Sequence, residues 1–78
     1  MRAKKEYIIL TFSTTTAAME AERRLTSGGI PGRLIPLPAE IDAGCGLAWR
    51  ILPEDYRIHA PAITALGEIV ESTWRLAL

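Results

Sequence analysis

The 78-residue sequence has little of several features that often signal function, beginning with metal ligands. It contains one cysteine, Cys45, and one histidine, His59. A zinc site takes about three or four protein ligands, so these two residues predict no metal site, and no cofactor motif accompanies them. A lone cysteine cannot form an internal disulfide, which favours a reducing, cytoplasmic setting.

An excess of charge is also lacking. Nine Lys and Arg balance nine Asp and Glu, so the formal net charge is +0. Nucleic-acid binding usually needs clustered surplus cations, and most of the basic residues here are scattered. No apolar run approaches the roughly 20 residues that span a bilayer, and the stretch YIILTF is too short for a signal peptide. We therefore expect neither a nucleic-acid nor a membrane partner.

Motifs of hydrolytic chemistry are missing as well. The sequence has neither a nucleophile elbow nor a glycine-rich phosphate loop. Hydroxyl residues 13–16 precede a predicted helix and could bind an anion through free backbone N–H groups, although capping of that helix accounts for them. An enzyme is therefore the least favoured class of function.

The length and the hydrophobic content of 49% predict one domain, residues 1–78, with a modest core and a flexible tail over residues 1–4. The first half predicts a strand and then a helix. Residues 7–12 are β-branched, aromatic and apolar on both faces, as in a central strand. Residues 17–25 carry a small apolar stripe and end before Gly28-Gly29, which is typical of a helix C-terminus.

The second half predicts two further strands, a helix and a last strand. Strand 32–37 contains Pro36, which favours a sheet edge or a bulge. A loop over 38–44, with room for one helical turn at 39–42, leads to strand 46–52, which Pro53 ends. A second helix is predicted to open at Ala60-Pro61. Residues 73–78 fit a short strand better than a continuation of that helix.

This order predicts an α+β fold: a ferredoxin-like β-α-β-β-α-(β) two-layer sandwich with an antiparallel or mixed sheet. We expect the first and third strands to be adjacent and parallel, with both helices on one face. The predicted core comprises Ile8, Leu10, Phe12, Leu25, Leu47, Trp49, Ile51, Leu66, Ile69 and Val70. Two short helices cannot also cover Leu37, Ala48, Leu52 and Trp74, so we expect self-association as a symmetric homodimer.

Cys45 lies between Gly44 and Gly46, and two interpretations of it stay open. Cysteine often behaves as a small buried hydrophobe. Glycine on both sides, however, removes local cover from the sulfur and costs conformational entropy that a purely structural cysteine would not need. From the residues alone, the two interpretations are about equally supported.

The run YIILTFSTTTAAMEAERRL…GGIPGRLIPLPAEIDAGCGLAWRI resembles the small prokaryotic family described as "putative Se/S carrier protein-like", over about residues 7–52. The resemblance rests on Thr11-Phe12-Ser13, Ala18, Glu22, residues 33–38 (RLIPLP), residues 44–48 (GCGLA) and Arg50. It implies that Cys45 carries sulfur or selenium, although the Cys-Pro-x-Pro motif of established small sulfur-relay carriers is absent.

On this reading Cys45 accepts the chalcogen from a donor protein, such as a cysteine desulfurase, and passes it to an acceptor protein. We expect Gly44 and Gly46 to give access, and Arg50 and Arg33 to stabilise the anionic adduct. The two prolines of Pro36-x-Pro38 would rigidify the approach to the loop. The alternative is a non-catalytic protein-interaction or regulatory module with a structural Cys45.

Activation of the thiol is not expected from the predicted topology. An unperturbed cysteine is only a few per cent thiolate at neutral pH, and a helix N-terminus or a nearby cation is the usual means of raising that fraction. Parallel first and third strands would place the loop before the third strand at the opposite end of the sheet from both helix N-termini. Glu40 and Asp42 add charge of the wrong sign, so a passive carrier is favoured over an enzyme nucleophile.

Overall fold

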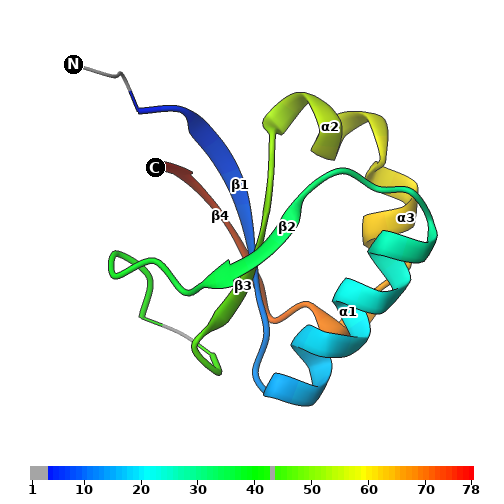
Figure 1. The fold of residues 1–78 in the computed structure, drawn as a ribbon, viewed down its shortest axis with the longest axis horizontal. Coiled ribbons are helices and arrows are strands. Elements are labelled where there is room, and N and C mark those ends of the chain that lie inside the picture. Colours follow the sequence, from blue (N-terminus) through cyan, green and yellow to red (C-terminus); the bar gives the residue numbers. More distant parts are fainter. Residues whose placement is uncertain (1–3, 43) are drawn as a thin grey trace.

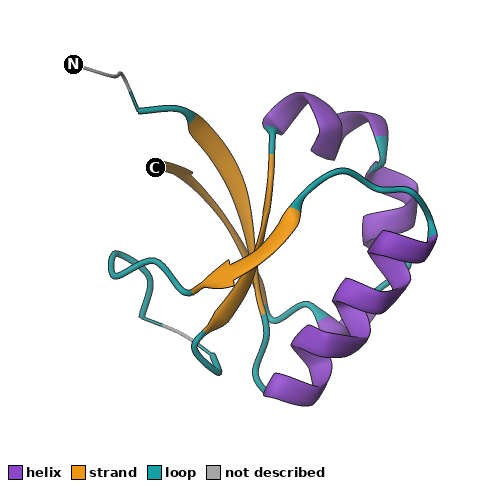
Figure 2. Cartoon of the chain, viewed as in Figure 1, coloured by secondary structure: helices purple, strands orange, loops and turns teal. Residues whose placement is uncertain are grey.

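The computed structural model describes residues 4–42 and 44–78, so the predicted tail over residues 1–4 lies almost wholly outside the described residues. Four strands form one sheet in the order β2-β3-β1-β4, and every neighbouring pair is antiparallel (Figure 1). The helices lie on one side of this sheet (Figure 2). The predicted α+β, ferredoxin-like class is confirmed. The elements are β1 (Glu6–Thr11), α1 (Thr15–Ser27), β2 (Arg33–Pro36), β3 (Leu47–Ile51), α2 (Pro53–Ile58), α3 (Ala60–Thr64), the 3-10 turn η1 (Gly67–Ile69) and β4 (Ser72–Ala77).

The first and third strands are adjacent, as predicted, but the prediction that they are parallel is wrong. Ile8 pairs with Ile51 and Thr11 with Ala48, which is an antiparallel register. The reason lies in the connections: α1 carries the chain back, so β2 runs in the direction of β1, and the β2–β3 pair then reverses the chain once more. Consequently the start of β3 lies beside the end of β1.

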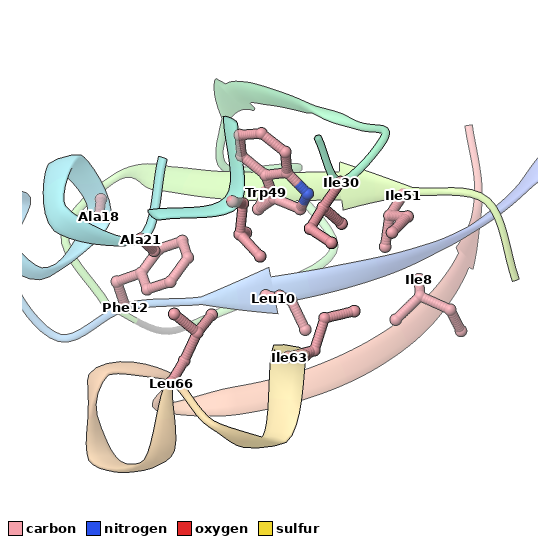
Figure 3. Close-up of a cluster of buried hydrophobic side chains, with 11 residues drawn as sticks. Ile8, Leu10, Phe12, Ala18, Ala21, Ile30, Trp49, Ile51, Ile63 and Leu66 are labelled. Carbon is pink, nitrogen blue, oxygen red and sulfur yellow. The ribbon is translucent and has the colours of Figure 1, made fainter. Parts of the chain in front are cut away.

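The central position predicted for the first strand is confirmed. Ile8, Leu10 and Phe12 point into the main core, while Ile9 is buried on the other face. Both faces of β1 must therefore be apolar, since neither meets water. Figure 3 shows the main core, in which the side chains of β1 and β3 meet those of α1 and α3.

Helix α1 begins and ends where its sequence dictates. The side chain of Thr14 accepts a hydrogen bond from the backbone N–H of Ala17 at 3.0 Å, which satisfies one of the free donors of the first turn. Gly28 is the C-cap, and its N–H bonds to the carbonyl of Arg24 at 3.0 Å. The helix is longer than the predicted 17–25, and its buried residues are the predicted stripe, Ala18, Ala21 and Leu25.

The second helical region differs from the single helix predicted to open at Ala60-Pro61. Pro53, which was interpreted as a strand breaker, also occupies the first turn of α2, where the missing N–H of proline costs nothing. Glu54 and Asp55 complement the positive end of the helix dipole in that turn. α2, α3 and η1 are three short pieces, so the predicted helix is one turn of α-helix followed by a 3-10 turn.

Most of the predicted core is buried. Seven of its ten residues are buried, and Leu47, Ile69 and Val70 are half-buried against the same cluster. The last segment is strand β4, as favoured, and it forms one edge of the sheet. Pro36 ends β2, which forms the other edge, in agreement with the prediction for this proline.

The helix-free face of the sheet is partly covered by the loop between β2 and β3. Ala48 is 0% exposed because Ile41, from the loop between β2 and β3, packs with Ala48 and Ile9. Leu37 and Leu52 are half-buried, and Trp74 remains 39% exposed. Within residues 4–42 and 44–78, no helix combines the length and apolarity that crossing a membrane would require.

Candidate functional site

The loop that carries the cysteine connects β2 to β3, and we call residues 37–46 the Cys45 loop; of these, residue 43 lies outside the described residues. The N–H of Leu37 bonds to the carbonyl of Gly46 at 2.9 Å and closes the base of the loop. The N–H of Ile41 bonds to the carbonyl of Pro38 at 3.0 Å. The helical turn considered for 39–42 is thus a single hydrogen-bonded turn that begins at Pro38.

Cys45 is held at the end of the central strand. Its backbone N–H bonds to the carbonyl of Phe12 at 3.0 Å. The side chain is half-buried and packs against the main core, and its Sγ lies 4.0 Å from the carbonyl oxygen of Leu47. The thiol is therefore neither fully open to solvent nor sealed in the core.

The backbone conformation explains why glycine occupies both positions beside Cys45, which the sequence did not reveal. Gly44 has a φ of 64°, and a Cβ there would collide with the carbonyl oxygen of Phe12. Gly46 has a φ of 91°, with open space around it. Since other residues rarely adopt these φ values, the glycines are required by the turn itself. They are consistent with access to the sulfur but are no longer an argument for it.

The position of the Cys45 loop corrects the sequence-based topology. Because β3 is antiparallel to β1, the loop lies at the end of the sheet where α1 begins, close to the connection between Phe12 and Thr14 (Figure 2). The prediction that it would face the C-terminal ends of the helices is wrong for α1. The objection to a thiolate at Cys45 that rested on helix dipoles therefore no longer holds for this helix.

Thr11 and two polar residues that the sequence did not single out, Glu71 and Ser72, surround the same end of β1. The hydroxyl of Thr11 donates to Glu71 Oε1 at 3.2 Å and makes a short contact with the hydroxyl of Ser72. The N–H of Glu71 bonds to the carbonyl of Thr11 at 2.8 Å, and its carboxylate faces Gly44. Only the β1–β4 pairing brings these residues together, so no local pattern could reveal them. Glu71 adds a further negative charge beside the loop.

The predicted arginines are not brought to Cys45. Arg33 and Arg50 are cross-strand partners on β2 and β3, and the Cζ atom of Arg50 lies 4.6 Å from the ring centroid of Tyr7. Tyr7 is near the start of β1, whereas Cys45 is bonded to Phe12 beyond its end. At about 3.3 Å per residue, five residues of strand separate the two places by roughly 16 Å.

The chemistry available at Cys45 is therefore that of a lone thiol with backbone support. Across residues 4–42 and 44–78, no three His, Cys, Asp or Glu side chains gather as metal ligands would. The carboxylate of Glu71 lies beside Gly44, and the loop itself carries Glu40 and Asp42. Such a thiol can exchange with another sulfur compound, while the described contacts provide no general base for it.

Comparison with known protein families gives a match. The family model described as "Putative Se/S carrier protein-like" matches residues 6–65, which is 60 of the 78 residues. The matched segment runs from the start of β1 past the end of α3 and includes the whole Cys45 loop. No curated protein and no solved structure matches the chain.

Proposed function

The chain belongs to the family described as "Putative Se/S carrier protein-like", and on that premise we propose that it carries sulfur or selenium on Cys45 from a donor protein to an acceptor protein. The observation that carries the proposal is the placement of its only thiol: Cys45 is half-buried, on a loop at the end of the central strand. A carrier must bind the chalcogen covalently and release it again, and a thiol is the group in this chain suited to do so.

The transfer is a thiol exchange that needs no external oxidant. The Cys45 thiolate attacks the terminal sulfur of a donor persulfide, R–S–SH. The donor S–S bond breaks, its electron pair leaves on the donor thiolate, and a new S–S bond forms at Cys45 Sγ. An acceptor thiolate then attacks the terminal sulfur of this persulfide and releases Cys45 as a thiolate. A selenosulfide, R–S–SeH, follows the same sequence.

The presence of a single cysteine in the chain supports this role. A lone thiol cannot be consumed by an internal disulfide, so a persulfide on Cys45 has no resolving partner within the chain. The absence of side chains at Gly44 and Gly46 is consistent with the approach of a protein donor, although the turn itself already requires these glycines. The donor we propose is a protein persulfide, such as that of a cysteine desulfurase, in a reducing cytoplasmic setting. The residues that would contact it are those of the Cys45 loop, including Pro38.

A second candidate function is a non-catalytic interaction module. Cys45 packs against the main core, and the φ angles of its glycine neighbours are required by the turn. Both observations would also be found for a cysteine that only fills space. Under this alternative the exposed surface of the Cys45 loop would bind a partner protein without any covalent step.

The test is intact-mass spectrometry after incubation of the protein with a cysteine desulfurase and cysteine. The proposal predicts an added mass of one sulfur atom on the wild-type chain, removed again by a reductant. Cys45→Ala and Cys45→Ser should gain nothing, and a thermal melt of each variant confirms that it is folded. The sulfur-carrying protein, separated from the desulfurase, should then transfer its sulfur to a small acceptor thiol.

The interaction module predicts a different outcome. The wild-type chain would stay at its unmodified mass, and Cys45→Ser would still bind the partner protein that the wild type binds. A mass gain that persisted in Cys45→Ser would contradict both candidates, because it would place the sulfur on some other group.

A further inference from the structure

Two arginines lie directly opposite each other near the far end of β3 from the Cys45 loop. Arg33 of β2 and Arg50 of β3 are cross-strand partners, so their side chains leave the sheet on the same face. Such partners have Cβ atoms about 4.5–5.5 Å apart, and like charges in this position weaken the strand pairing. The stability of the sheet therefore does not explain this pair.

Neither arginine is neutralised by an ion pair among the described residues. The salt bridges that those residues form join Arg23 and Arg24 to Glu20, and Arg75 to Glu6. Arg50 is half-buried and its guanidinium lies over the ring of Tyr7, a contact that fixes the position of its charged end. Its N–H donors are thus oriented before any ligand arrives.

A pocket of ≈ 270 Å³ opens at this pair, and the charged residues that line it are two arginines and one aspartate. The lining includes Tyr7, Gly32, Arg33, Arg50 and Asp55. A Cβ at Gly32 would collide with the indole nitrogen of Trp49 and lie 2.6 Å from the carbonyl oxygen of Arg50. Only glycine therefore fits at this position of the lining.

We propose that this pocket binds the oxyanion group of a small molecule, a phosphate or a carboxylate, between the guanidinium groups of Arg33 and Arg50. Guanidinium groups present paired N–H donors that match two oxygens of such an anion. A bound anion would also remove the repulsion between the two arginines. The site is separate from Cys45 by roughly 16 Å of strand, and it does not rest on the proposed carrier function.

The test is a titration of the wild-type chain with sodium phosphate and, separately, sodium acetate, at constant ionic strength. Backbone amide resonances in ¹H–¹⁵N spectra report where each anion binds. We expect saturable shifts at residues 32–33 and 50–52 and none at residues 44–46. The tighter of the two anions identifies the ligand group as phosphate or carboxylate.

Three variants complete the test. Arg33→Gln should weaken binding by about tenfold, because one charge-assisted contact is lost, and Arg50→Gln should do the same. The matched control is Arg75→Gln on β4, which removes the same charge outside the pocket and should bind like the wild type. Because the Arg33 side chain is exposed, its variant remains informative even if loss of the Tyr7 contact unfolds Arg50→Gln. Shifts that do not saturate, or equal binding by all three variants, would overturn the proposal.

Discussion

The two faces of the sheet are buried by different means. The helix-covered face meets α1 and α3, and its core contains large side chains such as Phe12, Trp49 and Leu66. The opposite face has a small cluster in which only Ile9, Ile41 and Ala48 are buried. One face thus depends on regular elements, whereas the other is covered partly by the Cys45 loop, in which Ile41 is the buried residue.

This difference explains how the Cys45 loop is held in place. Ile41 packs on the helix-free face, and Cys45 packs against the main core on the helix-covered side. The loop therefore contacts both faces of the sheet at the end where β1 finishes. Substitutions on either face should therefore affect the stability of the domain and the reactivity of the Cys45 thiol, but to different degrees.

The largest effect is expected from the helix-covered face. Trp49→Ala should lower the free energy of unfolding by about 3–5 kcal/mol, because a large cavity is left at a residue that is 2% exposed. Chemical denaturation measures this directly. A variant that melts within a degree or two of the wild type would contradict the packing of Trp49.

The control for this variant is Trp49→Phe. The indole N–H of Trp49 is buried and has no hydrogen-bond partner among the described residues. Replacing it with phenylalanine keeps most of the apolar contact and removes an unsatisfied donor. Its loss of stability should therefore be well below that of Trp49→Ala. Equal losses would mean that the indole N–H makes a stabilising hydrogen bond.

The next largest loss of stability is expected from substitutions where the Cys45 loop contacts the end of β1. Gly44→Ala must adopt a φ of 64° and collide with the carbonyl of Phe12, so we expect a loss of about 3 kcal/mol. Gly46→Ala must also adopt a left-handed φ, but its Cβ has open space around it. Its free energy of unfolding should therefore fall by only about 1–2 kcal/mol. Denaturation of the two variants side by side measures the difference. The reverse order would show that Gly44 is not pressed against Phe12.

A smaller loss is expected on the helix-free face. Ile41→Ala should cost about 2 kcal/mol, the low end for a buried isoleucine, because its cluster is small. Releasing this residue should also speed the reaction of Cys45 with a thiol reagent. Ile58→Ala is the matched control, since Ile58 is 58% exposed and its loss should change neither quantity. Unchanged labelling in Ile41→Ala would show that Ile41 does not hold the Cys45 loop.

The remaining apolar surface of the helix-free face should mediate self-association. Trp74 is 39% exposed on the edge strand β4, on the same face as Leu76 and Ile9. With a formal net charge of +0, no repulsion opposes a two-fold dimer. Sedimentation should give about twice the chain mass of 8.6 kDa, and Trp74→Ser should weaken the dimer. A monomer at hundreds of micromolar would contradict this prediction.

Much of the fold could be predicted from local patterns. The apolar faces of residues 7–12 indicated a central strand, and Pro36 indicated an edge, because both follow from hydrogen bonding and burial within the strand itself. The direction of β3 was predicted wrongly, since it depends on how two connections reverse the chain. Pro53 was ambiguous for a physical reason: the missing N–H that ends a strand also suits the first turn of a helix.

Less of the candidate site could be predicted. Cys45 and its glycines were found from their spacing, but the contact between Gly44 and Phe12 depends on tertiary pairing. Ile41 lies in a loop without periodicity, so nothing marked it as buried. Arg33 and Arg50 were assigned to Cys45, whereas the strand register places them together at Tyr7.

The carrier proposal requires that the thiol of Cys45 can be reached without unfolding of the domain. The most direct measurement is the rate at which a small thiol reagent labels the native protein at about pH 8, repeated at increasing urea below the unfolding transition. We predict a rate within about a factor of ten of a free thiol, with little dependence on urea, because local movement of the loop is sufficient. Labelling only in denaturant, with a rate that rises in parallel with unfolding, would contradict the proposal.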